Sequence, residues 1–229
     1  MINNNSIFSA AWRAHIESQD FPCVAAKAAM SKGQQKIFTA GHLACPKDDK
    51  AIIDFIYSFV DEYRKSETMF HSVVILFEQP TIHSEEAYSK MFWERLQALS
   101  DLDSQFHAYD KRVSDDPESP EFSFSLSEEA FFVVGLHPAS SRASRRFKYP
   151  AIVFNPHAQF EQLRQAGQYE KMKNIIRKKD VELEGSINPM LEDFGSSSET
   201  YQYTGQQLTK AWKCPLHILH GTNENYKSA

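Results

Sequence analysis

The chain has 229 residues, of which 41% are hydrophobic and 13% aromatic, and its formal net charge is −5. The apolar content, which includes 17 Phe, suffices for a substantial core and is unlike that of a disordered chain. An acidic chain has no excess of Lys and Arg with which to displace counterions, so the charge argues against a general nucleic-acid-binding protein.

The sequence also lacks signals for a membrane or an export pathway. Its longest apolar runs are far shorter than the roughly 20 residues that span a bilayer. The N-terminal segment, MINNNSIFSA, has neither the basic nor the long apolar region of a secretory signal peptide. Three cysteines form no CxxC pair and leave an odd count, which favours reduced thiols. We therefore expect a cytoplasmic protein with no membrane association; the oligomeric state stays open, with a homodimer as one option.

In the first half of the chain, apolar residues recur mainly at helical spacing. The clearest amphipathic helix covers 48–65, where Ile52, Phe55, Ile56, Phe59, Val60 and Tyr63 share one face. Ser84 is typical of an N-cap, and the helix after it should bury Ala87, Met91, Leu96 and Leu99. The elements predicted here are helices at 6–18, 23–31, 48–65 and 84–101, and strands at 36–40 and 70–77.

In the second half, strand patterns come close together. Residues 122–126 alternate Phe and Ser before Leu, and a very short turn joins them to a second strand, so the two should form a hairpin. The polar stretch 110–120 reads as a surface loop. The elements predicted here are strands at 122–126, 130–136 and 151–155, helices at 156–165 and 168–184, a loop at 185–195, and a polar tail.

These strands do not alternate regularly with helices, which argues against a doubly wound parallel sheet. The predicted fold class is therefore α+β, with a central, mainly antiparallel sheet flanked by helices. No obvious linker divides the chain, so residues 1–229 are expected to form a single domain.

The most informative stretch lies between the last two predicted strands. Each of these strands ends in a histidine, His137 after 131–136 and His157 after 151–154, and three arginines lie between them. Imidazole can ligate a metal or haem iron, and guanidinium holds carboxylates or phosphates in a bidentate way. The pattern suggests a site for an anionic cofactor or substrate, in which the arginines are Arg142, Arg145 and Arg146.

Each of these features also has an ordinary structural interpretation. A histidine at a strand end can simply be buried and bonded to the backbone, and an arginine-rich loop can be a solvated surface. Cys23 can be a small core residue or, in the first turn of a helix, a thiolate ligand. The acidic loop with Glu192, Asp193 and Glu199 can be exposed or can hold a cationic substrate group. No Rossmann, Walker, HExxH or GxSxG motif is present to decide between these.

Several motifs resemble those of the YqcI/YcgG family. The match extends across almost the whole chain, although residues 47–120 are less distinctive. The motifs that carry the resemblance are FPC from Phe21, FFVVGLHPASSRASRRFKYPAIVFNPHAQFEQLR from Phe131, INPMLEDFG from Ile187, QYTG from Gln202 and WKCPL from Trp212.

The resemblance implies a haem-dependent monooxygenase that N-hydroxylates a guanidine group of arginine or a related amino acid. Its partners would be haem b, O₂, an electron donor and the small-molecule substrate. His137 is then the expected iron ligand, with His157 and Cys23 as rivals. Arg142, Arg145 and Arg146 are expected to bind the haem propionates, and Glu192, Asp193 or Glu199 to hold the guanidinium.

Two alternatives remain at the level of the sequence. The protein can be a haem-binding sensor or carrier without hydroxylase activity, in which case the acidic loop is dispensable. It can also be a haem-free protein whose histidines and arginines bind a phosphorylated or carboxylated metabolite.

Overall fold

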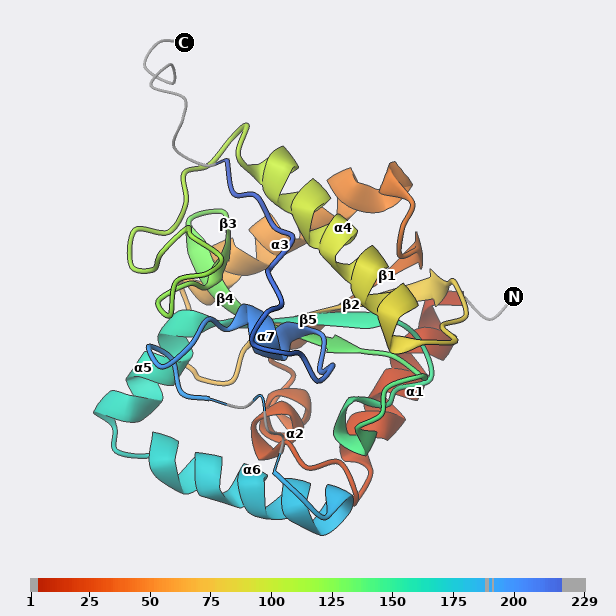
Figure 1. The fold of residues 1–229 in the computed structure, drawn as a ribbon, viewed down its shortest axis with the longest axis vertical. Coiled ribbons are helices and arrows are strands. Elements are labelled where there is room, and N and C mark those ends of the chain that lie inside the picture. The colour runs from red at the N-terminus through yellow and green to blue at the C-terminus, as the bar shows by residue number, and fades with distance from the viewer. Residues whose placement is uncertain (1–3, 188–189, 191, 220–229) are drawn as a thin grey trace.

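The computed structural model describes residues 4–187, 190 and 192–219; Asn188, Pro189 and Leu191 of the predicted 185–195 loop lie outside the described residues. A five-stranded sheet in the order β1-β2-β5-β4-β3 lies between two layers of helices (Figure 1). Its strands are β1 (Gln35–His42), β2 (Ser72–Gln79), β3 (Phe124–Leu126), β4 (Glu129–Leu136) and β5 (Ala151–Pro156). The helices are α1 (Asn4–Glu17), α2 (Val24–Ser31), α3 (Asp49–Tyr63), α4 (Glu85–Asp103), α5 (His157–Gln165), α6 (Tyr169–Glu184) and α7 (Thr200–Tyr203), with short 3₁₀ turns η1 (Pro46–Asp48) and η2 (Ala143–Arg145).

The sheet is mixed but mostly antiparallel, which confirms the predicted α+β class. Strands β1 and β2 run parallel and are connected through α3, whereas the other neighbouring pairs are antiparallel. The predicted hairpin is confirmed as β3 and β4, with Phe124 opposite Phe131. Its turn residues, Ser127 and Glu128, both have φ of 55°, a left-handed conformation that suits so tight a connection.

Helices α3 and α4 cover one face of the sheet and build the larger part of the core (Figure 1). On α4, Ser84 caps the helix as predicted and accepts a hydrogen bond from the Ala87 amide at 3.1 Å. Leu96 and Leu99 are buried as expected, but Ala87 is exposed. The helix instead turns Tyr88 and other aromatic side chains inward, because large rings bury more apolar area than a methyl group. On α3 the predicted face is buried except for half-buried Phe55, and Ile53 joins it.

Arg95 is a buried charge within this core layer. Its side chain is 2% exposed and forms an ion pair with Asp49 at the start of α3. It also donates hydrogen bonds to the main-chain oxygens of Leu43 and Cys45, both at 2.7 Å. Since a buried guanidinium is tolerated only when it is paired and hydrogen-bonded, Arg95 fixes the chain between β1 and α3 against α4.

Helices α1, α2, α5 and α6 lie on the opposite face (Figure 1). Side chains alternate along a strand, so residues of β4 and β5 divide between the two faces. Phe131 and Phe154 belong to the core with α3 and α4, whereas Phe132 and Val153 line a cavity under the other helices. The sheet therefore separates a closely packed core from the side that carries the cavity.

Within the described ranges, none of the helices combines the length and the apolar character needed to cross a bilayer.

Candidate functional site

A cavity of about 310 Å³ lies between the sheet and the helices α1, α2, α5 and α6. Its size falls within the range found for small-molecule and cofactor sites. The walls are mostly aromatic and aliphatic, with a few charged groups among them. The aromatic residues of the wall include Phe21, Phe70, Phe132, Phe160, Tyr169 and Phe194.

The two strand-end histidines do not share a site. Strands β4 and β5 are antiparallel neighbours, with Leu136 opposite Ala151 and Phe131 opposite Pro156. The end of β4 therefore lies beside the beginning of β5, and the two histidines follow opposite ends of the pair. Strand alternation also sends them to opposite faces, because His157 lines the cavity and His137 stacks on Tyr88 of α4.

His137 is enclosed on the α4 side of the sheet and is not among the residues that line the cavity. It is 1% exposed, and its ring lies 4.1 Å from the Tyr88 ring, nearly parallel to it. Its main-chain amide donates to the oxygen of Arg145 at 3.1 Å. Burial lowers the pKa of His137 to about 4, so the imidazole is neutral at physiological pH. Its Nδ1, like that of His157, is buried without a hydrogen-bond partner among the described residues. His137 differs from His157 in that it does not line the cavity, which favours the structural interpretation.

The low pKa of His137 predicts a specific pH dependence of stability. Because the pKa is about 4 in the folded chain and 6.5 ordinarily, the unfolded state binds the extra proton between these values. Stability from this group is fully present above pH 6.5 and falls as the pH approaches 4. His137→Phe keeps a ring against Tyr88 but removes the titration. Between pH 7.5 and 5 the wild type should lose about 1–2 kcal/mol more unfolding free energy than His137→Phe in urea titrations. Equal losses would contradict this.

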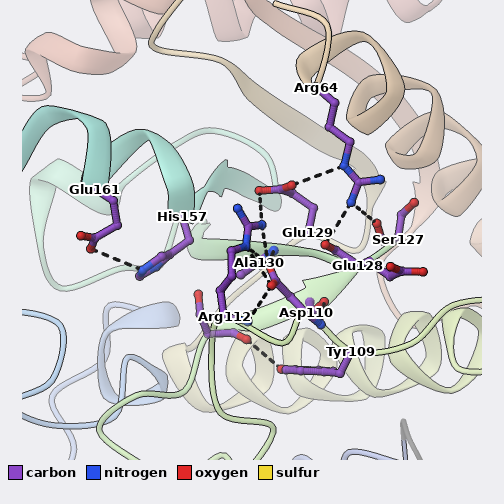
Figure 2. A network of polar contacts seen from close by, with 12 residues as sticks. Arg64, Tyr109, Asp110, Arg112, Ser127, Glu128, Glu129, Ala130, His157 and Glu161 are labelled. Atoms are coloured by element: carbon purple, nitrogen blue, oxygen red, sulfur yellow. Dashed lines mark hydrogen bonds and ion pairs between the residues drawn. The ribbon is translucent and has the colours of Figure 1, made fainter. Parts of the chain in front are cut away.

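His157 stands in the wall of the cavity at the first position of α5. It is 6% exposed, and its ring lies 4.4 Å from that of Phe194. Both ring nitrogens face carboxylates. Nδ1 lies 3.6 Å from Glu199 Oε1, and Nε2 lies 3.7 Å from Glu161 Oε1, the contact that Figure 2 shows. Nδ1 is buried without a hydrogen-bond partner among the described residues. An imidazole oriented by a carboxylate at one nitrogen can ligate a metal through the other, so Glu199 at Nδ1 would leave Nε2 for a metal, with Glu161 beside it.

Glu199 is the buried carboxylate of the cavity wall. It is 4% exposed and accepts hydrogen bonds from Ser123 Oγ at 3.0 Å and from the Tyr203 hydroxyl at 3.2 Å. Both bonds reach one oxygen, which leaves Oε1 directed at His157. Glu199 immediately precedes α7, a helix that the sequence reasoning did not predict because it lies in a polar, glycine-containing tail. One turn of that helix brings Tyr203 back onto the same carboxylate.

Only one of the three predicted arginines lines the cavity. Arg142 pairs with Asp180 of α6 at 2.7 Å, and Arg146 donates to the main-chain oxygens of Ser140 and Ser141. Arg145 lines the cavity, where its guanidinium donates to the main-chain oxygens of Gly135, Gln202 and Tyr203 at 3.1–3.3 Å. Burial lowers the pKa of Arg145 to about 10. All three acceptors of the Arg145 guanidinium are neutral main-chain oxygens. No carboxylate lies within 4 Å of this guanidinium in the described part of the chain.

Cys23 also lines the cavity, from the N-cap position immediately before α2. Burial raises the pKa of its thiol, although the amides of Ala25 and Ala26 act in the opposite direction. The thiol is therefore the favoured form, in contrast to the activated thiolate that a helix N-terminus alone suggests.

The two remaining predicted carboxylates lie in the cavity wall in different states. Asp193 is held by Lys173 Nζ at 3.0 Å and by the Tyr169 hydroxyl at 3.4 Å. Burial raises the pKa of Asp193, but the ammonium of Lys173 outweighs it and keeps the pKa below its usual value. Glu192 is exposed, and its main-chain oxygen accepts from Gln202.

Sequence reasoning missed the contribution of α6. Lys173, Arg177 and Asp180 line the cavity from this helix, which the sequence analysis predicted at 168–184 without assigning it a place in the site. Met172 and Ile176, at helical spacing on the same face, were the signal that this face is covered.

A second group of charged residues near β4 is fully paired within itself (Figure 2). Arg112 binds Asp110 through two nitrogens and reaches Glu129 at 2.9 Å, and Arg64 approaches Glu129 at 3.6 Å. Burial raises the pKa of Asp110, but hydrogen bonds from Arg112 and Ala130 lower it more. Because each charge has a partner, this network connects α3, β4 and the loop after α4 and leaves no charge for a ligand.

Within the described residues no three His, Cys, Asp or Glu side chains are grouped so that they could hold a metal ion.

A model of the YqcI/YcgG family matches residues 12–217, and the chain belongs to this family. Two similar proteins come from Bacillus subtilis (strain 168). "Uncharacterized protein YcgG" is 26% identical over 216 residues, which cover 89% of this chain and 83% of that protein. "Uncharacterized protein YqcI" is 27% identical over 182 residues, which cover 76% of this chain and 70% of that protein. No solved structure matches the chain.

Proposed function

We propose that this protein is a haem-dependent monooxygenase that N-hydroxylates the guanidine group of arginine or a related amino acid. The observation that supports it most is His157, a buried imidazole with carboxylates at both nitrogens in the wall of a largely apolar cavity. The oxygenase activity and the substrate come from the family resemblance and not from the geometry.

The residues present fit a haem. A porphyrin supplies most of the iron ligands itself, so one protein side chain suffices, and the aromatic walls suit an apolar macrocycle. His157 is the proposed ligand in place of His137, and Arg145 the proposed partner of a propionate. When bound, the haem would supply the activation of O₂, while the chain binds, orients and excludes water. We also propose that the protein is cytoplasmic, because its cysteines are free thiols.

The acidic side chains would divide the other tasks. Glu199 is proposed to accept a hydrogen bond from His157 Nδ1 and so to fix the ring, because its other oxygen is already held by Ser123 and Tyr203. Glu192, exposed at the cavity wall and without an ion pair among the described residues, is proposed to hold the guanidinium of the substrate. Asp193 is the weaker candidate for this role because Lys173 already neutralises it.

Incubation of the ferrous, haem-loaded protein with O₂, a chemical electron donor and L-arginine tests this function. We expect a product heavier by one oxygen atom in mass spectrometry, and a Glu192→Gln variant that needs about tenfold more substrate for half-maximal rate, from the loss of one charge-assisted bond. A haem spectrum without turnover of any guanidine would favour the sensor or carrier. A folded, colourless protein from haem-supplemented cells would refute the haem proposal.

A second candidate is a haem-free binder of an anionic metabolite. The observation in its favour is Arg145, a cavity-lining guanidinium whose hydrogen-bond acceptors are all neutral.

A further inference from the structure

The charged residues of the cavity wall are only partly paired with one another. Four of them belong to direct ion pairs: Lys173 pairs with Asp193, Asp180 with Arg142, and Arg164 with Glu161. Glu199 faces His157. Two guanidinium groups remain, Arg145 and Arg177, and neither has a carboxylate within 4 Å in the described part of the chain. The remaining acid of the wall, Glu192, is exposed, and Arg177 acts on Asp193 only at longer range, where its charge contributes to lowering the pKa of that carboxyl. Neither guanidinium therefore has a close anionic partner among the described residues of the wall.

Arg177 is the less expected of the two. It lies on α6 and lines the cavity, and its Nε atom is buried without a hydrogen-bond partner among the described residues. A buried donor without an acceptor costs free energy, so such a group usually has a partner that the isolated chain does not supply. A residue that served only the fold would carry no such cost.

Arg177 and Arg145 belong to the same region of the wall. Helix α6 packs on the 3₁₀ turn that carries Arg145. Asp180, one turn after Arg177 on α6, is close enough for its charge to raise the pKa of Arg145 against the effect of burial. The wall where α6 meets this turn thus presents two guanidinium groups to one space.

We propose that Arg177, together with Arg145, binds a carboxylate of the molecule that occupies the cavity. Guanidinium is suited to this because its planar set of donors matches a carboxylate in a bidentate way. The inference deepens the proposed function and rests on it for the identity of the ligand. Under that function the carboxylate belongs either to a haem propionate or to the α-carboxylate of an arginine-like substrate.

Arg177→Gln tests the proposal, with Lys171→Gln as the matched control. Lys171 is exposed on the same helix and does not line the cavity, so both variants lose one positive charge from α6. Arg177 Nε has no hydrogen-bond partner among the described residues, and its charge acts on Asp193 without a contact within 4 Å, so Arg177→Gln should fold and melt nearly like the wild type. Circular dichroism of the ligand-free proteins checks this first.

The ligand is then identified with two matched pairs of probes. Haem is compared with haem dimethyl ester, which lacks free carboxylates, by absorption titration. L-Arginine is compared with agmatine, which lacks the α-carboxylate, by calorimetry. Arg177→Gln should raise the dissociation constant of the carboxylate-bearing member of one pair about tenfold or more, and leave the other member unchanged. An effect on haem binding would identify the ligand as a haem propionate, and an effect on arginine binding would identify it as the α-carboxylate of the substrate.

The outcomes separate this inference from the proposed function. If the wild type binds haem or arginine and Arg177→Gln behaves like Lys171→Gln with every probe, the inference is wrong and the function stands. If the wild type binds neither, the proposed function fails and malonate decides the inference. Malonate should then raise the melting temperature of the wild type and of Lys171→Gln but not of Arg177→Gln; equal shifts, or none, would overturn it.

Discussion

Replacing His157 with alanine should remove the haem absorption band of the purified protein, whereas replacing His137 with alanine should leave it. His157 lies in the wall of a roomy cavity with Glu199 and Glu161 at its nitrogens, while His137 is enclosed against Tyr88 on the other face of the sheet. Loss of an outer partner of a metal ligand already costs about 10–100-fold in affinity, so loss of the ligand itself should cost roughly 100-fold or more. Absorption titration with haem measures the effect.

Added imidazole provides the control for this experiment. In His157→Gly, free imidazole can occupy the space that the side chain leaves, and it should restore the band if the lost group was the ligand. Cys23→Ala should bind haem normally, because burial favours the neutral thiol. A normal band in His157→Ala, together with a lost one in Cys23→Ala, would transfer the role to Cys23.

The second large effect concerns stability. Arg95→Met should lower the free energy of unfolding by about 3–5 kcal/mol, because it leaves Asp49 as a partly buried charge without its partner and removes the donors to Leu43 and Cys45. Lys90→Met on the same helix is the control, since its side chain is 78% exposed and it should change stability little. Urea denaturation monitored by circular dichroism measures both. A loss below about 1 kcal/mol for Arg95→Met would show that the chain between β1 and α3 does not depend on this residue.

Most of the fold could be predicted because its signals are local. The amphipathic face of α3, the cap at Ser84 and the alternation before the β3–β4 turn each depend on residues close in sequence. The failures have equally local reasons. Ala87 fits a helical period, but Tyr88 has far more area to bury, and α7 is too short and polar to show a period.

The candidate site was harder to predict because it depends on strand order. His137 and His157 look equivalent in the sequence, each following an apolar strand beside a proline. Their separation follows only from the antiparallel pairing of β4 with β5, which no local pattern specifies. Arg177 was overlooked for a related reason. In the sequence KNIIRKK, Arg177 cannot be told from the lysines that follow it. Only the packing of α6 over the cavity distinguishes Arg177 from them.

The two faces of the sheet differ in how well they should tolerate substitutions, because one carries the larger core and the other carries the cavity. Residues beneath α3 and α4 supply the close packing that keeps the chain folded, so replacements there are costly whatever the ligand. On the cavity side, the face of α6 borders empty space and carries the unpartnered Nε of Arg177, so replacements on that face should cost less folding free energy. Under the proposed function, replacements on this one helix would change which molecule is bound, while the strands and the helices packed on their other face stay as they are.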